Sequence, residues 1–399
     1  MTKTTVDAGD EAGSKISRRN LLKLGGSLAV GAGLGAALAP GSSRALDSSG
    51  AGALSPGVAP SPIIDIHRHC MPGPSSTLEG LVQSAVHMRL GFDENDAHPS
   101  ATLEGISSVI YRDMRDIDLQ VQKQDEAGVT KGLLSFSMML EISCEALWLP
   151  SSQVARRLND ATAALVARYP TQLDFMVMVN PFEESSVEEC ERCLRDHGAK
   201  GINIGTSWEG RFLDSPEIDP FWEYAQDRGA PIFLHPPMVP IGHEQMNLYK
   251  LEEVVGRPFD TTMTVSRMIY SGVFDRYPGL RIVLPHMGGG LLNVIGRLDF
   301  GHRLGYEGLP EGQAAVCERK PSEYLRTNLY VDTMGFSAAG IRHCIEVFGA
   351  DRVLFGTDYG PVPISPSEHI DLVKSLGLSP EDEAKIFWKN ASDLFGLAV

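Results

Sequence analysis

The stretch "SPIIDIHRHCMP", residues 61–72, decides how the fold of this chain is interpreted. A short apolar, β-rich run leads directly into His67 and His69, which are one residue apart. Side chains at i and i+2 of a strand point to the same side, so both imidazoles are expected to project together from the end of a buried strand. Two such imidazoles suit a metal ion, whose coordination a third histidine and a carboxylate can complete.

Seven more β-rich runs follow along the chain, and segments with helical periodicity lie between them. The predicted strands are residues 63–66, 132–137, 174–179, 201–204, 231–234, 281–285, 329–333 and 352–356. Predicted helices include residues 151–169, 185–198 and 219–229. Eight strands alternating with helices predict an α/β fold, a (β/α)₈ TIM barrel, with an insertion after strand 1 over residues 70–117. The alternative, an open doubly wound sheet that binds a dinucleotide, would want a GxGxxG turn after the first strand, and none is present.

Reactive side chains follow three other predicted strands. His235 follows the fifth strand, His286 the sixth and Asp358 the eighth. The carboxyl ends of barrel strands meet on one face, where active sites lie, so these residues are expected to converge with the first pair. Taken singly, each also fits a structural role, such as shaping a turn or capping a helix. Together they favour a metal site.

The first 45 residues are predicted to be a twin-arginine export signal. Arg18 and Arg19 precede an apolar run rich in Gly and Ala, and Ser43 and Ala45 place small residues at −3 and −1 of a cleavage site. The alternative is a membrane anchor, but the run is short and Gly-rich for a span of ~20 residues. We therefore expect residues 46–61 to be a linker, residues 62–399 to form the barrel, and the protein to be exported, periplasmic or extracellular, without stable membrane insertion after cleavage.

Composition excludes some classes of protein. The net charge of −16 argues against binding to nucleic acid, because such proteins neutralise phosphates with Lys and Arg. Six cysteines are too few and too scattered for a disulfide scaffold. The "CERC" pair, Cys190 and Cys193, lies in a charged helical stretch and is interpreted as helix surface and packing.

Four motifs carry a resemblance to a known family: "DIHRHCMP", "FLHPP", "VLPHMGGG" and "LFGTDYG". They resemble the signatures of the amidohydrolase superfamily, of the amidohydrolase 2 type. The chain is most similar to its branch of aminocarboxymuconate-semialdehyde decarboxylase-like enzymes, and the similarity runs through most of residues 62–398. That collinear match is far more specific than the HxH pair alone.

The resemblance implies a role for each of these positions. The implied metal ligands are His67, His69, His235 and Asp358. It implies His286 as the residue that activates or orients a metal-bound water. In a decarboxylation that follows from such a site, Asp358 or His286 is expected to transfer the proton. Arg297 matches an arginine that binds the substrate carboxylate and that this branch can supply across a dimer interface, so a homodimer is expected; the alternative is an ordinary helix-face arginine. Zn²⁺ is the expected ion, and Mn²⁺ also fits a mixed His/Asp set.

One departure from the family pattern concerns the substrate. Gln120 and Gln122 stand where the decarboxylases have arginines, with Arg112 and Arg115 nearby. This puts the muconate substrate in question, though not the metal chemistry.

Three functions are therefore carried forward. The first is a metal-dependent decarboxylase of a small unsaturated or aromatic carboxylic acid. The second is a metal-dependent hydrolase of a lactone, amide or related bond, which would need the same metal, water and His286. The third is an exported metal- or ligand-binding protein without catalysis.

Overall fold

The computed structural model describes residues 61–71, 89–91, 100–103, 106–109, 111–136, 140–147, 149–305, 308–310 and 312–399. The predicted signal, almost all of the predicted linker and part of the predicted insertion lie outside these residues, so those expectations stay predictions. Within the described part of the chain, no helix is both long enough and apolar enough to cross a bilayer.

Parallel strands form the predicted barrel. In chain order they are β1 (Ile64–Arg68), β5 (Lys131–Leu134), β6 (Leu173–Phe175) with β7 (Val177–Met178), β8 (Ile202–Gly205), β11 (Ile232–His235), β12 (Ile282–Leu284), β13 (Leu329–Asp332) and β14 (Val353–Leu354). They pair in the orders β1-β5-β6 and β7-β8-β11-β12-β13-β14. All eight predicted strands are thus confirmed, the third of them as two short pieces.

Backbone hydrogen bonds join the two sets of strands into one barrel. Between β6 and β7, the amide of Met176 donates to the carbonyl of Leu134 at 2.9 Å. At the other junction the amide of Ile66 donates to the carbonyl of Phe355 at 3.1 Å, and that of His69 donates to Tyr359 at 2.9 Å. The eighth strand therefore lies beside the first, which brings the two ends of the sequence pattern to one site.

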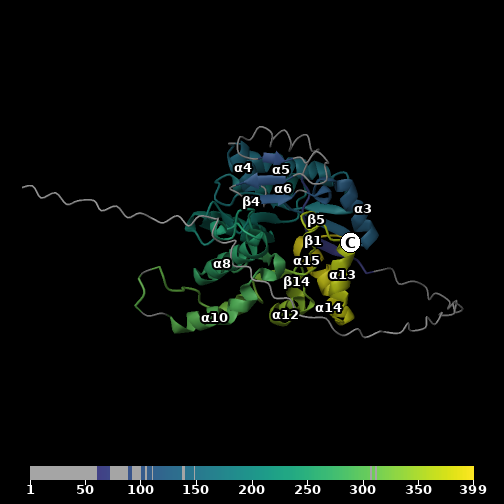
Figure 1. Cartoon of the computed structure of the whole chain (residues 1–399). Helices are drawn as coiled ribbons and strands as arrows, with labels where there is room; N and C mark the ends of the chain where they lie inside the picture. The colour runs from purple at the N-terminus through teal and green to yellow at the C-terminus, as the bar shows by residue number, and fades with distance from the viewer. Residues whose placement is uncertain are drawn as a thin grey trace, which may run out of the picture. The chain divides into compact units, whose positions relative to one another are not determined.

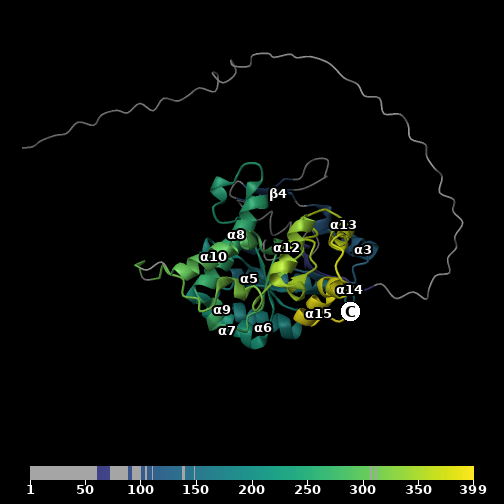
Figure 2. The same cartoon turned by 90° about the horizontal axis from the view of Figure 1, so that it is seen from below.

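Helices surround the strands. They are α3 (Ile117–Ala127), α4 (Leu140–Leu147), α5 (Ser151–Val166), α6 (Ser186–Asp196), α7 (Asp219–Arg228), α8 (Arg257–Tyr270), α9 (Val273–Arg276), α10 (Leu291–Leu304), α11 (Pro321–Tyr324), α12 (Ala338–Phe348), α13 (Pro366–Lys374), α14 (Pro380–Ala384) and α15 (Asn390–Phe395). In Figure 1 the first and last strands lie near α13 and α15, and Figure 2 shows the helices following one another around the outside, from α8 and α10 through α7 and α6 to α14 and α13. The three helices predicted at 151–169, 185–198 and 219–229 are confirmed as α5, α6 and α7.

The predicted insertion after the first strand carries structure of its own. Strands β2 (Arg89–Gly91), β3 (Ser100–Leu103) and β4 (Ile106–Val109) form an antiparallel sheet separate from the barrel. The short helix α2 (Arg112–Arg115) then leads into α3. The insertion therefore adds a second, small sheet and does not extend the barrel.

Alternation along the strands separates two buried regions. On β11, Ile232 and Leu234 belong to the core between strands and helices, whereas Phe233 belongs to the cluster that fills the barrel. That inner cluster also contains Phe395 of α15, so the C-terminal helix contributes to it. Each such side chain contributes roughly 1.5–3 kcal/mol on burial. Cys190 and Cys193 on α6 are fully buried in the outer core, so packing, not helix surface, accounts for the CERC pair.

A β-bulge in β1 orients the histidine pair. Asp65 pairs with Gly132 and Arg68 pairs with Leu134, so three steps along β1 match two along β5. The extra residue breaks the simple alternation: Ile64 and Ile66 belong to the inner cluster, and the next residue, His67, also faces the barrel interior. Bulges redirect side chains in this way next to active sites.

Candidate metal centre

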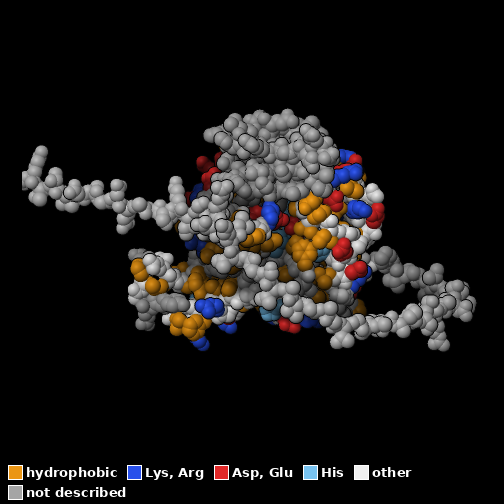
Figure 3. Space-filling view, in the orientation of Figure 1, with side chains coloured by type: hydrophobic (Ala, Val, Ile, Leu, Met, Phe, Trp, Pro, Cys, Tyr) orange, Lys and Arg blue, Asp and Glu red, His pale blue; other side chains and the backbone are white. Residues whose placement is uncertain are grey.

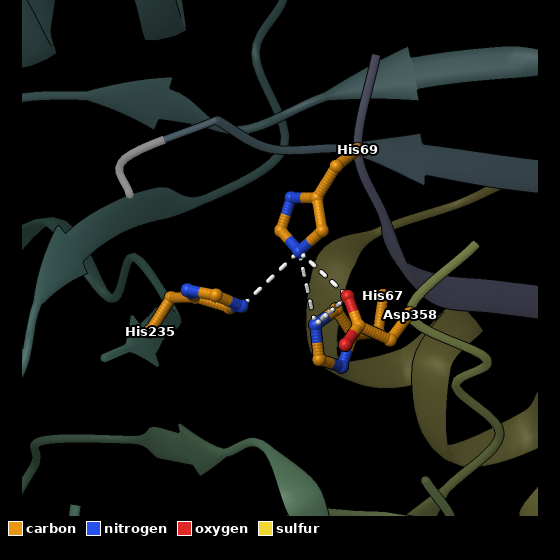
Figure 4. Close-up of side chains that lie close together, drawn as sticks. All are labelled: His67, His69, His235 and Asp358. Atoms are coloured by element: carbon orange, nitrogen blue, oxygen red, sulfur yellow. Dashed lines mark hydrogen bonds and ion pairs between the residues drawn. The ribbon is translucent and has the colours of Figure 1, made fainter. Parts of the chain in front are cut away.

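Four buried side chains converge at the carboxyl end of the barrel. They are His67, His69, His235 and Asp358, and their ligand atoms lie within 4.8 Å of one another. Nε2 of His69 lies 3.1 Å from Nε2 of His67 and 3.1 Å from Nε2 of His235. Oδ1 of Asp358 lies 3.1 Å from Nε2 of His69 and 3.3 Å from Nε2 of His67. Figure 4 shows the three rings and the carboxylate pointing toward one centre.

This donor set fits a divalent cation. Two ligands bound at roughly 2.0–2.1 Å to a tetrahedral ion lie about 3.3–3.4 Å apart, close to the separations seen here. Oδ1 of Asp358 is buried and has no hydrogen-bond partner in the structure. A buried carboxylate oxygen without a partner is costly, and a cation between it and the imidazoles would remove that cost.

The outer nitrogen of each imidazole has its own partner. Nδ1 of His67 lies 2.6 Å from Oδ2 of Asp332, Nδ1 of His69 lies 2.8 Å from the carbonyl of Ser135, and Nδ1 of His235 lies 3.0 Å from the carbonyl of Pro236. Each Nδ1 can donate to these acceptors, which leaves the Nε2 lone pair free to face an ion. Ligating histidines in proteins are held in this manner.

The electrostatics of the cluster also favour a cation. Burial lowers the pKa of His69, and burial together with the neighbouring histidines places the pKa of His235 well below its usual range. Burial alone would raise the pKa of Asp358, but the charge of His67 and the contacts with the neighbouring histidines outweigh it and hold that pKa well below normal. Burial likewise opposes protonation of His67, yet Asp358 and Asp332 raise its pKa to about 10, so this ring carries a positive charge beside Asp358 unless a cation replaces its proton. An ionised carboxylate thus lies beside three imidazoles.

His286 lies beside this cluster, as predicted. It follows β12, and its Nε2 lies 3.4 Å from Oδ2 of Asp358. Its ring centroid is 5.2 Å from that of His67 and 5.6 Å from that of His235. Its Nδ1 is buried and has no hydrogen-bond partner in the structure. The carboxylate of Asp358 therefore orients His286, whose Nδ1 stays available for substrate or water.

Arg297 is not brought to the cluster within one chain. It lies on α10 and is exposed, whereas all four candidate ligands are buried. The predicted role of Arg297 at a site across an interface therefore stays a prediction.

Gln120, one of the two glutamines named above as a departure from the family pattern, has a structural role. Gln120 is fully buried on α3, and its Nε2 donates to the carbonyl of His69 at 2.8 Å. It also accepts from Arg68 at 3.3 Å. Of the two nearby arginines, Arg112 is exposed and pairs with Asp116 at 3.0 Å. Gln120 thus supports the backbone of a ligand, and Arg112 is engaged at the surface.

Two aspartates near the site were not identified from the sequence. Asp332 contacts His67, as described above. Asp65 accepts from the backbone amide of Thr357 at 3.1 Å and from its hydroxyl at 2.7 Å, which ties β1 to the segment that carries Asp358. The available signal was a charged residue inside each apolar run, "IIDI" and "LYVDT", because a fully buried aspartate needs partners.

Comparisons with known proteins show the family of this chain. A family model described as Amidohydrolase matches residues 64–397. The chain is 31% identical over 248 residues to 2-amino-3-carboxymuconate-6-semialdehyde decarboxylase of Dictyostelium discoideum, covering 61% of this chain and 67% of that protein. It is 32% identical over 293 residues to gamma-resorcylate decarboxylase of Polaromonas sp., covering 70% of this chain and 87% of the relative.

Solved structures show the same fold. The 5-carboxyvanillate decarboxylase of Sphingomonas paucimobilis superposes with a TM-score of 0.71 at 24% identity, over 85% of this chain and all (100%) of that one. A dihydroxybenzoic acid decarboxylase of Polaromonas sp., solved with bound manganese, superposes with a TM-score of 0.66 at 25% identity, over 84% and 97% of the two chains. With a family model that spans most of its length and a barrel that gathers three histidines and an aspartate, the chain belongs to the amidohydrolase family.

Proposed function

We propose that this protein is a metal-dependent decarboxylase, a carbon–carbon lyase, that acts on a small unsaturated or aromatic carboxylic acid. The observation that carries the proposal is the buried convergence of His67, His69, His235 and Asp358 with His286 beside them. The relatives reported above are named as decarboxylases of such acids, and this supports decarboxylation over hydrolysis.

The metal ion and the protein side chains have different roles in the proposed reaction. A divalent ion held by the four residues would act as a Lewis acid on oxygen ligands and lower the pKa of a bound water. In the reaction the bond between the carboxylate and its carbon breaks, CO₂ leaves, and the electron pair stays on that carbon until a proton replaces the carboxylate. The protein must therefore hold a proton close to this carbon.

We propose that His286 moves that proton. Its Nδ1 is buried and unpartnered, while Oδ2 of Asp358 on the Nε2 side fixes the ring orientation. Histidine exchanges protons near neutral pH, and a positioned general acid contributes typically 10²–10⁴-fold to the rate. We assign proton delivery to His286, with the Asp358 carboxylate stabilising the protonated ring.

Product analysis tests the proposal. The metal-loaded protein is incubated with 2,6-dihydroxybenzoate, 5-carboxyvanillate and 2-amino-3-carboxymuconate semialdehyde, and in parallel with a set of lactones and amides. Release of CO₂ together with the decarboxylated product is the expected result. Acid formation from a lactone or amide, without CO₂ from any carboxylate, would establish the hydrolase alternative instead.

We further propose zinc as the resident ion, with manganese as the alternative. Three imidazoles favour zinc, whereas the carboxylate is compatible with manganese. A relative solved with manganese supports the second ion. Metal analysis of protein purified without added metal, followed by comparison of kcat for zinc-loaded and manganese-loaded samples, distinguishes the two.

We also propose that the protein is a homodimer in which Arg297 binds the substrate carboxylate of the partner's site. Arg297 lies on the same helix as Phe300 and Leu304, which are 50% and 47% exposed, and Phe259 and Met263 on the neighbouring α8 are 62% and 50% exposed. Figure 3 shows hydrophobic side chains gathered on this side of the molecule. Large exposed apolar patches mark interaction sites, and an arginine beside one suits bidentate binding of a carboxylate.

Mixed dimers test this arrangement. The Arg297→Ala and His286→Ala homodimers should each be inactive, whereas random mixing in equal amounts should restore up to about one quarter of wild-type activity. If the mixture stays inactive although the subunits exchange, Arg297 does not act at the partner's site. A monomeric mass in light scattering would likewise contradict the proposal of a shared site.

Export is proposed from residues 1–45 alone. The adjacent Arg18 and Arg19 are its basis. Replacing both with lysine should retain the protein in the cytoplasm, and N-terminal sequencing of the exported protein should start after Ala45.

A further inference from the structure

We propose that Asp332 is a positioning residue that holds the His67 ring with its Nε2 toward the other candidate ligands and also holds the turn that carries His286. The proposal rests on the metal site of the proposed function, but not on the reaction class. Asp332 ends β13 and is fully buried. Neither its place in the sequence nor the four-residue cluster identifies it as part of the site.

One carboxylate oxygen of Asp332 contacts the candidate ligand. Oδ2 lies 2.6 Å from Nδ1 of His67, with both side chains inaccessible to solvent. A contact this short is typical of a charge-assisted hydrogen bond. With Nδ1 donating to Asp332, Nε2 of His67 carries the lone pair that faces Asp358 and His69, so the carboxylate selects the tautomer that can bind an ion.

The other oxygen fixes two loops. Oδ1 accepts from the amide of Met287 at 3.1 Å and from the amide of Met334 at 3.2 Å. Met287 directly follows His286, and these two residues have φ values of 56° and 53°. Such values are uncommon for residues other than glycine and persist only where the surroundings enforce them. The bond from Asp332 to Met287 is one such constraint on the turn.

Packing around Met287 reinforces that constraint. A Cβ added at Gly335 would lie 1.9 Å from Cε of Met287, and one added at Gly340 would lie 2.9 Å from it. The loop after β13 and the start of α12 therefore close around this side chain. Asp332 thus connects a metal ligand on β1 to the proton-transfer residue after β12, although it lies 265 positions from His67 in the sequence.

Three substitutions test whether these specific contacts of Asp332 matter, or whether loss of any buried carboxylate would have the same effect. In Asp332→Asn, the amide oxygen can still accept from Met287 and Met334, but the NH₂ group then faces Nδ1 of His67 and opposes its protonation. Asp332→Ala removes both contacts. Asp260→Asn is the matched control, because Asp260 is also a buried carboxylate, 2% exposed, that binds Thr206 and Ser207.

The experiment measures binding of Zn²⁺ alone by competition with a chromophoric chelator, together with thermal unfolding of the metal-free proteins. We expect Asp332→Asn to weaken zinc binding about 10–100-fold, and Asp260→Asn to bind as the wild type does even if it unfolds earlier. Wild-type zinc affinity in Asp332→Asn would overturn the proposal. Absence of zinc binding in the wild type would instead contradict the proposed metal site, so the two failures are distinguishable.

A measurement on the wild-type protein keeps the proposal testable if a variant does not fold, and a comparison of two variants tests the contact with the turn. In wild-type zinc-loaded protein with ¹⁵N-labelled histidine, the His67 signal should show its proton on Nδ1; a proton on Nε2 would overturn the assignment. At saturating zinc, kcat of Asp332→Ala should fall below that of Asp332→Asn, because only the alanine variant loses the bond to the His286 turn. Equal kcat values for the two variants would show that the bond from Asp332 to the His286 turn does not affect catalysis.

Discussion

Buried polar side chains define the chemistry at the scale of single residues. An imidazole or carboxylate without solvent needs compensating partners, and in this barrel the outer nitrogens of the three histidines find protein acceptors while the inner nitrogens and Oδ1 of Asp358 face one another. The same principle explains Gln120, which is fully buried and donates to the carbonyl of His69.

Removing one ligand should remove the ion. We expect His67→Ala and Asp358→Ala to lose most bound metal. The first variant lacks one coordinating nitrogen, and the second lacks the anionic ligand that balances the charge of the ion. Metal content measured by mass spectrometry of the purified proteins checks this. His343→Ala, which changes a histidine that is half-exposed on α12, is the control and should keep full occupancy; stoichiometric metal in both ligand variants would exclude the assigned site.

His286 should be needed for turnover but not for metal. Its imidazole contacts Asp358 without belonging to the four-residue cluster, so His286→Gln is expected to retain the ion while kcat falls about 10²–10⁴-fold. His302→Gln on α10 is the comparison, because His302 bonds the carbonyl of Cys317. Loss of metal from His286→Gln would instead make this residue a ligand.

At the scale of elements, the ends of β1 and β14 set the geometry of the site. The bulge between Asp65 and Arg68 places the histidine pair inward, and Asp65 accepts from Thr357 in the segment after β14. Gly360 then lets the following turn approach the first strand closely. It has a φ of 121°, and a Cβ there would lie 2.2 Å from the carbonyl oxygen of His69.

Substitution of Gly360 should therefore disturb both folding and metal binding. Gly360→Ala combines an unfavourable φ with a backbone clash, and we expect a loss of roughly 2–4 kcal/mol in the free energy of unfolding and lower metal occupancy. Gly377→Ala is matched to it, since Gly377 has a φ of 62° with nothing within 4 Å, and should cost about 1–2 kcal/mol with occupancy unchanged. Denaturant titration and metal analysis check both; equal effects would rule out the close approach as the cause.

At the scale of the whole molecule, the candidate site links distant parts of the barrel. His67 on β1, His235 on β11 and Asp358 after β14 come from strands that enclose the same interior. An ion bound to all three would stabilise the folded state relative to the unfolded chain, because the unfolded chain does not assemble the site.

Chelation should lower the thermal stability of the protein. At a free metal concentration one hundred times the Kd, binding contributes about 2.7 kcal/mol, so dialysis against a chelator is expected to lower Tm and abolish activity. Adding back Zn²⁺ or Mn²⁺ should restore both, as followed by calorimetry and by CO₂ release. His67→Ala is the control, because it is expected to have lost its metal already. Its Tm should not change when it is dialysed against the chelator.

Much of this architecture was predictable because it is periodic. Eight apolar runs separated by segments with helical periodicity predicted the barrel, and polar residues after four of them predicted the convergence of His67, His69, His235, His286 and Asp358. The break of the third strand at Met176 was not predictable, since each half follows a different neighbour. Asp332 was missed for a related reason: one aspartate inside an apolar run does not reveal its partner.

The sequence by itself determined which side chains stand at the strand ends, because alternation and burial are local properties of each strand. Only the tertiary structure decided how these side chains face one another. The bulge in β1, the bond from Asp332 to His67 and the support of His69 by Gln120 each join segments that are distant in the chain. Such contacts depend on the closure of the barrel and on the partners available inside it, and no local pattern encodes either.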